Sequence, residues 1–206
     1  MAATDIISLT EAKHEIGGLS SNLDDTLLAA YISAVSEHID RLVGPVVNRT
    51  ITGETHDTNG ERELFLRSTP VSSITTCTEY LLGGTAQTIT PDTVATKNAY
   101  GCWLNTTDAH SARLARRMNG MPTYWPVGGT VVITYVAGRY ATTAAVNELY
   151  KHAARLAVAT NWSIQQGSGS ATWGAPEGAA MAPLPIVMPR AVEAMLLSER
   201  RVPGIA

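Results

Sequence analysis

Five histidines are the residues of this chain best suited to metal binding or acid–base chemistry, but their spacing supports neither role. None of them has a second histidine or a cysteine at the spacing that metal sites use. The tetrapeptide DAHS at 108–111 contains an acid, a base and a nucleophile. A catalytic triad, however, is assembled in space and not from sequence neighbours. The sequence therefore predicts no catalytic residue, no metal site and no cofactor, and an enzyme is not expected.

Signatures of nucleotide binding and of redox chemistry are also missing. GSGS at 167–170 lacks the lysine and the following serine or threonine of a phosphate-binding loop, so a linker is the expected structure. The two cysteines, Cys77 and Cys102, are far apart in the sequence and fit neither a disulfide framework nor a zinc site. Such cysteine usage is typical of a reducing compartment.

One basic cluster could bind a partner. It consists of Arg113, Arg116 and Arg117, with Trp103, Tyr124 and Trp125 nearby in the sequence. Arginines neutralise phosphates and aromatic rings stack on bases, so a DNA contact is one interpretation. A solvated face or an inter-subunit contact is the other. The net charge of −3 shows no overall basic balance of the kind that nucleic-acid binding favours.

The composition predicts a folded protein with few surface charges. Of the 206 residues, 45% are apolar, which is enough for a core, and only 16% are charged. Soluble domains typically have about 25% charged residues. Either other copies cover part of the surface, or the surface is polar and uncharged. No apolar run approaches the roughly 18 residues that span a membrane, and no membrane contact is expected.

Three helices are predicted from apolar spacing and end signals, at 8–16, 22–43 and 143–163. Ser8 and Glu11 form a capping box before the first helix, and Asn22 or Asp24 can cap the second. The second helix carries an apolar stripe at spacings of three and four, and we expect it to be the core scaffold. Its members are Leu27, Leu28, Tyr31, Ile32, Val35, Ile39 and Leu42. The buried face expected for the third helix consists of Val146, Leu149, Tyr150, Ala153, Leu156 and Ala157.

The segment 46–140 reads as strands, except that its middle, 91–126, shows no clear pattern. VVNRTITGETH and LFLRSTPV, separated by the turn DTNGE, predict one hairpin, and SITTCTEYLL and TAQTIT predict a second. TVVITYVAG is the clearest strand, with Val131, Ile133 and Tyr135 on one face. The fold class predicted is α+β. Three core helices pack on an antiparallel β region within a core domain at 1–163.

Residues 164–206 are predicted as a Gly/Ala/Pro-rich extension that carries a short helix at 189–199. This helix either folds back on its own domain or docks on a partner. The docking residues would be Val192, Met195, Leu196, Leu197, Arg200 and Arg201.

Three phrases, in this order, resemble the tailed-phage head–tail connector (adaptor) family. ISLTEAKHEIGGLSSNLDDTLLAAYISAVSEHID is similar to the family's short helix with an LxEAK phrase, its acidic DD turn and its long helix. LRSTPVSSITTCTEY is similar to its Leu-x-x-x-Pro-Val strand pair. VVITYVAGRY, before an alanine-rich helix, is similar to its Tyr-x-Ala-Gly junction. The resemblance covers roughly residues 6–160.

The resemblance implies a structural virion protein. Members of the family form a ring, typically twelve-fold, beneath the portal at the capsid vertex, where they extend the DNA channel and carry the next connector or the tail. The implied partners are further copies of the chain, the portal protein, the next neck or tail protein, and double-stranded DNA that passes without sequence-specific binding. The implied location is the head–tail junction of the virion, assembled in the host cytoplasm.

Two other classes stay open. One is another phage ring component, a stopper or a tail terminator, which would be mostly β. The other is a nucleic-acid-binding packaging protein such as a small terminase subunit, in which Arg113, Arg116 and Arg117 would contact DNA.

Overall fold

The computed structural model describes residues 2–17, 22, 24–108, 111–168 and 186–199. The chain forms two compact units. Among the described residues, the helical unit combines the chain up to Val47 with the chain from Tyr140 to Glu199, and the β unit is Asn48–Arg139. The α+β class is confirmed, and so is the presence of a C-terminal helix.

Four helices build the helical unit over the residues that the structure describes. They are α1 (Leu9–Glu15), α2 (Asp25–Val43), α3 (Glu148–Ser168) and α4 (Arg190–Leu196). Short 3₁₀ turns at Thr143–Ala145 and Leu197–Glu199 precede α3 and follow α4. Helix α3 continues past the predicted end at 163, into the stretch that the composition had assigned to a linker.

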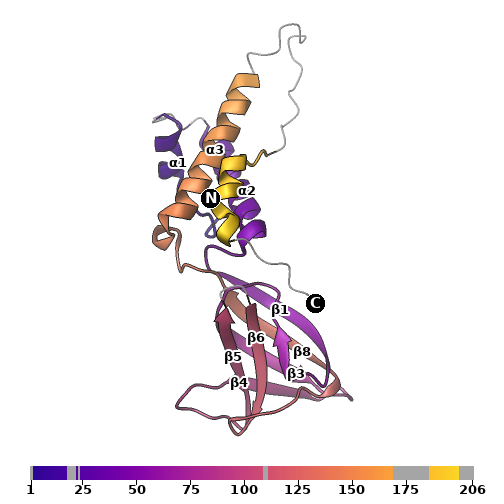
Figure 1. The fold of residues 1–206 in the computed structure, drawn as a ribbon. Coiled ribbons are helices and arrows are strands. Elements are labelled where there is room, and N and C mark those ends of the chain that lie inside the picture. Colours follow the sequence, from indigo (N-terminus) through magenta and orange to yellow (C-terminus); the bar gives the residue numbers. More distant parts are fainter. Residues whose placement is uncertain (1, 18–21, 23, 109–110, 169–185, 200–206) are drawn as a thin grey trace. The chain divides into compact units, whose positions relative to one another are not determined.

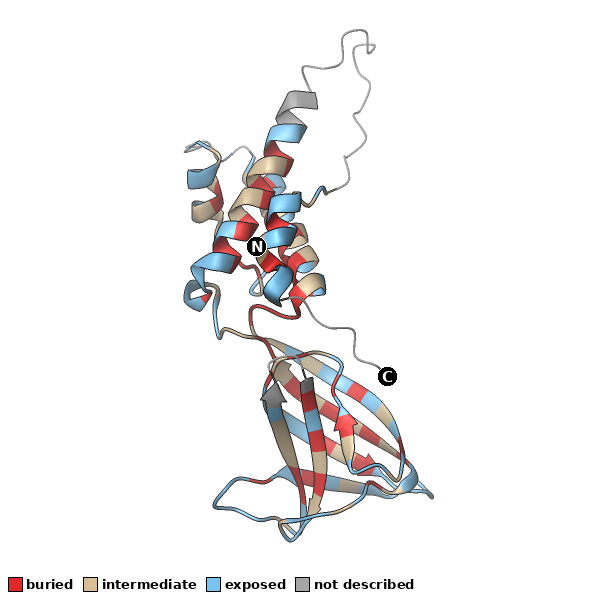
Figure 2. Ribbon diagram, in the orientation of Figure 1, coloured by how far each residue is buried: buried red, intermediate tan, exposed pale blue. Residues whose placement is uncertain are grey.

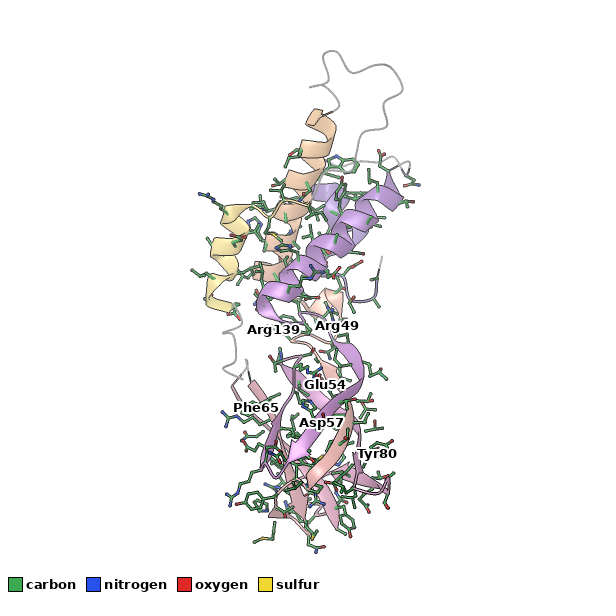
Figure 3. All side chains as sticks on the ribbon, turned by 90° about the vertical axis from the view of Figure 1, so that its right-hand side faces the viewer. Arg49, Glu54, Asp57, Phe65, Tyr80 and Arg139 are labelled. Atoms are coloured by element: carbon green, nitrogen blue, oxygen red, sulfur yellow. The ribbon has the colours of Figure 1, made fainter. Side chains whose placement is uncertain are left out.

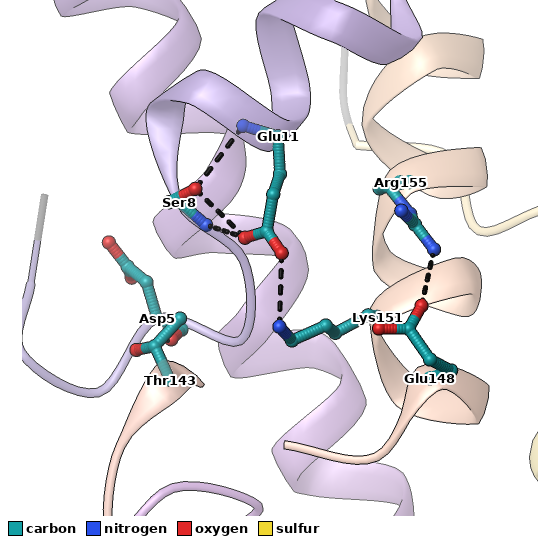
Figure 4. Close-up of polar contacts among 7 residues, drawn as sticks. All are labelled: Asp5, Ser8, Glu11, Thr143, Glu148, Lys151 and Arg155. Atoms are coloured by element: carbon teal, nitrogen blue, oxygen red, sulfur yellow. Dashed lines mark hydrogen bonds and ion pairs between the residues drawn. The ribbon is translucent and has the colours of Figure 1, made fainter. Parts of the chain in front are cut away.

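The ends of the first two helices have identifiable causes. The capping box is confirmed. The Glu11 N–H donates to the Ser8 hydroxyl at 3.2 Å, and the Ser8 N–H donates to the Glu11 carboxylate at 2.7 Å (Figure 4). The expected side-chain cap of α2 is not formed, because Asp24 occupies the N-cap position without a capping hydrogen bond. Gly44, at φ 87°, ends α2.

The predicted stripe on α2 is confirmed with one correction. Leu28, Ile32, Val35 and Ile39 are buried, and Tyr31 and Leu42 pack against the same core partly buried. The prediction that Leu27 belongs to the core is wrong, since this side chain is 44% exposed at the edge of the stripe. Leu149 of α3 is likewise 39% exposed, whereas the rest of that predicted face is buried or packs on the core.

The described part of the β unit contains eight strands. They are β1 (Arg49–Asn59), β2 (Glu63–Phe65), β3 (Val71–Tyr80), β4 (Ala86–Pro91), β5 (Tyr100–Asp108), β6 (Ser111–Met118), β7 (Met121–Pro122) and β8 (Val127–Ala137). Their order in the sheet is β1-β8-β3-β4-β5-β6-β2, with β7 beside β6. The pairing is antiparallel except between β4 and β5, which are parallel.

The first predicted hairpin is wrong, and the second is confirmed. β1 pairs with β8 over nearly its whole length, whereas the three-residue β2 pairs with β6. A strand as short as β2 offers β1 few partners, and the long strand β8 satisfies many more of its backbone groups. β3 and β4 pair antiparallel as expected, and β8 buries Val131, Ile133 and Tyr135 on one face.

The sheet folds into two layers around a core. Figure 1 shows β5 and β6 in front of β8 and β3. The inward side chains include Trp125, Leu114 and Tyr135, all at most 1% exposed. Along β8, buried positions alternate with partly buried ones, as the pleat requires (Figure 2).

Candidate interaction surfaces

Arg116, predicted as a DNA or inter-subunit contact, lies inside the β unit. Its Nε and Nη2 donate to the two carboxylate oxygens of Glu79 at 3.0 and 2.9 Å. Glu79 is fully buried on β3 and Arg116 is 9% exposed on β6. This bidentate pair joins the two layers of the sheet and cannot meet a partner, so the prediction for Arg116 is wrong.

A second buried carboxylate, Glu54, is held by hydrogen bonds. It accepts from the Tyr135 hydroxyl at 2.7 Å and from the Arg67 N–H at 3.0 Å, and His56 Nε2 lies 2.7 Å from its Oε1. Burial acts to raise the pKa of Glu54, but these hydrogen bonds outweigh it and lower the pKa below its usual 4.5. Burial and the bond to Glu54 raise the pKa of Tyr135 to about 12. Both oxygens of the Glu54 carboxylate have hydrogen-bond partners, and the cluster joins β1 to β8 and to the chain at Arg67.

Arg113 and Arg117 point outward on β6, two residues to either side of Ala115. The Arg113 guanidinium lies 5.1 Å from the centre of the Phe65 ring, and Arg117 lies 4.6 Å from that of Trp103. Lys97 adds a second cation 5.6 Å from the Trp103 ring. We call this surface the aromatic face. Its residues are Glu63, Phe65, Lys97, Trp103, Arg113, Ala115 and Arg117.

The aromatic face is partly paired. Arg113 lies 3.4 Å from Glu63, in an exposed pair that contributes little to stability. Arg117 has no carboxylate partner among the described residues. Sequence reasoning missed Phe65 and Lys97. The alternation of a strand over ARLARRM could have separated Arg116 from Arg113 and Arg117. Trp125 is buried, and Tyr124 is exposed with Arg62 over its ring.

The other outer surface of the β unit is rich in threonine, and sequence reasoning missed it. One row crosses four strands as Thr55, Val132, Thr78 and Thr88. Neighbouring rows place Thr134 beside Thr76, and Asp57 beside Thr130. We call this surface the threonine face. Its residues are Thr50, Thr55, Asp57, Ser73, Thr76, Thr78, Tyr80, Thr88, Thr130, Val132, Thr134 and Val136.

Helix α4 folds back on its own unit, which was one of the two predicted alternatives. The Asn161 side chain on α3 donates to the Val187 carbonyl oxygen and accepts from the Val187 N–H, both at 2.8 Å. Beyond the helix, the Tyr150 hydroxyl donates to Glu199 at 3.0 Å. These contacts hold both ends of α4 against α3.

The predicted docking residues of this helix divide into three groups. Val192 and Leu196 are 0% and 1% exposed in the core of the helical unit, so these two are wrong as contacts for a partner. Met195 is half-buried, and Leu197 is 64% exposed beside a groove of about 330 Å³ between α2 and α4. Arg200 and Arg201 lie outside the described residues.

An ion pair joins helix α1 to helix α3. Lys151 Nζ lies 3.0 Å from Glu11 Oε1 (Figure 4). Burial acts to raise the pKa of Glu11, but the bonds from Ser8 and Lys151 outweigh it and lower the pKa. The Thr143 hydroxyl also donates to the Asp5 carbonyl oxygen at 2.6 Å.

Cys77 and Cys102, distant in sequence, are neighbours in the β unit. Both are free and buried, and the hydrogen bond to Cys102, together with burial, raises the pKa of Cys77. In the described ranges, no three His, Cys, Asp or Glu residues gather closely enough to hold a metal ion. The described helices include none long and apolar enough to cross a membrane. Of the tetrapeptide DAHS, residues 109–110 lie outside the described part.

No protein-family model matches the chain, and no curated protein does. Several solved structures match it over nearly its full length. A chain in the neck of an empty gene transfer agent (GTA) particle, computed with six-fold symmetry, has a TM-score of 0.65 at 19% identity, covering 100% of this chain and 96% of the other. A chain in the virion of a native GTA particle has 0.62 at 18%, covering 98% and 92%.

A third match comes from the neck of a native GTA particle computed with twelve-fold symmetry. Its TM-score is 0.51 at 20% identity, covering 100% of this chain and 98% of the other. The chain therefore has the fold of a chain found in GTA necks, and the likeness includes both units and α4.

Proposed function

We propose that this protein is a structural component of a virion neck, the head–tail adaptor of a tailed phage or phage-like particle. The observation that carries the proposal is the likeness of fold to GTA neck chains over the whole length of both proteins. The three adaptor-like phrases of the sequence support the same assignment independently. In this role the protein forms a ring under the portal, extends the DNA channel and carries the next neck or tail protein.

Two features of the structure are consistent with a ring protomer. The β unit has two extended outer surfaces with different chemistry, the threonine face and the aromatic face. The structure of one of the similar necks was computed with twelve-fold symmetry, and we expect this protein to form a homo-oligomeric ring of twelve copies. The mostly β stopper and tail-terminator classes fit less well, because α2 and α3 form a substantial helical unit.

For the contact with the portal we propose the exposed side of α4. Leu197 and the adjoining groove present apolar surface, whereas Val192 and Leu196 are already used by the protein's own core. Deleting the C-terminal helix would therefore be a poor test, since it would also remove two core residues. A surface substitution avoids this difficulty.

The test is electron microscopy of the protein mixed with the portal protein encoded in the same genome. An added tier of density on the portal is the expected result, and no added density from the intact protein would refute the adaptor role. Leu197→Asp should weaken the tier, and Val94→Asp, on an 86% exposed loop residue of the β unit, is the matched control. A full tier with Leu197→Asp would refute the docking surface alone.

A further inference from the structure

The threonine face has an unusual shortage of charge. Among its residues only Asp57 is charged, and its carboxylate accepts a hydrogen bond from Thr130 at 3.1 Å. The solvated face of an antiparallel sheet is polar, whereas the buried core of a protein interface is depleted of lysine, glutamate and aspartate. Hydroxyl and methyl groups pack closely and lose little conformational entropy on burial, so the composition suits a surface that another chain covers.

The aromatic face has the complementary composition. Phe65 is 61% exposed although a large aromatic ring gains much from burial. Arginine and aromatic residues are the types enriched in protein interfaces and at their energetic centres. Three cations and one carboxylate make the face net positive.

The two faces point in opposite directions. The pair Glu79–Arg116 shows that the inner surfaces of the two layers meet, so their outer surfaces face away from each other. Figure 3 shows Phe65 on one side of the β unit and Tyr80, from the threonine face, on the other. A closed ring built from one kind of subunit needs such an arrangement, because each copy offers one surface to the neighbour before it and a different one to the neighbour after it.

We infer that the threonine face of one copy packs on the aromatic face of the next, as a head-to-tail contact between subunits. This inference rests on the proposed ring function and states which surfaces close the ring. The threonine face offers no cation to repel Lys97, Arg113 and Arg117, and Asp57 adds the one charge that attracts them.

The size of the contact predicts that it is weak between two free copies. From Thr130 to Val136 the face extends for roughly 20 Å along β8, and four strands span roughly 14 Å across it, which makes roughly 300 Å². A stable pair of proteins typically buries about 800 Å² on each partner. Assembly on a template, where each copy is held by several contacts at once, overcomes this weakness.

Cross-linking between introduced cysteines tests the geometry. Thr76→Cys lies on the threonine face and Ala115→Cys at the centre of the aromatic face, and the native cysteines are each only 1% exposed. A bismaleimide reagent should convert the double variant into a ladder of multimers. Neither single variant should give cross-linked dimers, because each cysteine faces a different surface of the neighbour. Both the free protein at high concentration and the portal mixture are treated.

A charge pair at one position tests the chemistry. Thr76→Lys places a cation opposite the net positive aromatic face, whereas Thr76→Glu, of nearly the same size, places an anion there. We expect the lysine variant to assemble at least roughly ten-fold less well than the glutamate variant. Circular dichroism checks that both variants fold. Equal assembly, or the reverse order, would overturn the inference.

The outcomes separate the contact from the function. Dimers from either single cysteine variant would mean that a face pairs with the same face of another copy. No ladder from the double variant, either free or with the portal, would mean that the threonine face and the aromatic face do not meet. Either result overturns the contact, even if the wild-type tier on the portal is present. A ladder without any tier would support the contact and refute the adaptor role. Salt-sensitive DNA binding that Arg117→Gln abolishes, without a ladder, would assign the aromatic face to nucleic acid instead.

Discussion

Truncating Leu196 tests whether α4 is a structural part of the helical unit. The side chain is 1% exposed, and Leu→Ala substitutions in protein cores cost about 2 to 5 kcal/mol. Leu196 also lines the groove between α2 and α4, so water can enter part of the space that the lost atoms leave. We therefore expect Leu196→Ala to lower the free energy of unfolding by about 2 to 4 kcal/mol.

The neighbouring residue provides the control. Leu197 is 64% exposed, and an exposed substitution changes stability by no more than about 0.5 kcal/mol. Urea unfolding followed at 222 nm reports on the helices. With a denaturant dependence of about 2 kcal/mol per molar, the Leu196 variant should shift the midpoint by roughly 1 to 2 M.

Equal midpoints for Leu196→Ala and Leu197→Ala would refute the packing of α4 against α2 and α3. In that case the helix would be available to a partner through its apolar side, and Val192 and Leu196 would return as docking residues. A large effect confined to Leu196 leaves only the outer side of α4 for the portal.

Four further predictions concern polar groups that hold the fold together. The pKa of Tyr135 is raised from 10.0 to about 12, so its contribution to stability is complete below pH 10 and is lost as pH rises towards 12. In unfolding experiments, the free energy of unfolding of Tyr135→Phe should fall by up to about 3 kcal/mol less between pH 10 and pH 12 than that of the wild type. Because the pKa of Glu54 is lowered in the folded protein, its ionised carboxylate stabilises the fold above pH 4.5. This stabilisation is lost as pH falls through the folded-state pKa, so Glu54→Gln should flatten the acid limb of the same titration. Arg116→Met alone should cost about 3 to 5 kcal/mol, and adding Glu79→Leu should recover most of it, as measured in a double-mutant cycle. Ser8→Ala should lower the melting temperature by an amount equivalent to about 1 kcal/mol, and unchanged melting would contradict the role of the capping box.

Helices and single strands could be predicted from the sequence because their signals are local. The capping box at Ser8 and Glu11, the stripe on α2 and the alternation on β8 each depend on residues a few positions apart. Leu27 was misplaced because a helical stripe has edges, and only the packed neighbours decide which edge residue stays in solvent.

The choice of strand partners could not be predicted in the same way. β1 does not pair with β2, the next strand in the sequence, but with β8 at the far end of the β unit. Pairing with β5 makes ARLARRM a strand, and the strand then places Arg116 on the inner face and Arg113 and Arg117 on the outer face. Cys77 on β3 and Cys102 on β5 likewise become neighbours only when segments far apart in the sequence come together. The likeness to adaptors was visible in short phrases, but the burial of Val192 and Leu196 needed the packed helices.

The path of the chain through the two units has a consequence for synthesis. Arg49 pairs with Ala137, so both ends of the β unit lie side by side, and Tyr140 donates its N–H to the Val46 carbonyl oxygen at 2.9 Å where the chain re-enters the helical unit. The ribosome thus releases α1 and α2 first, but their packing partners α3 and α4 emerge only after the whole inserted β unit. The β unit can fold while the nascent helices still expose their apolar sides, and the helical unit is completed last. The apolar sides of α1 and α2 make the nascent chain prone to aggregation during that interval.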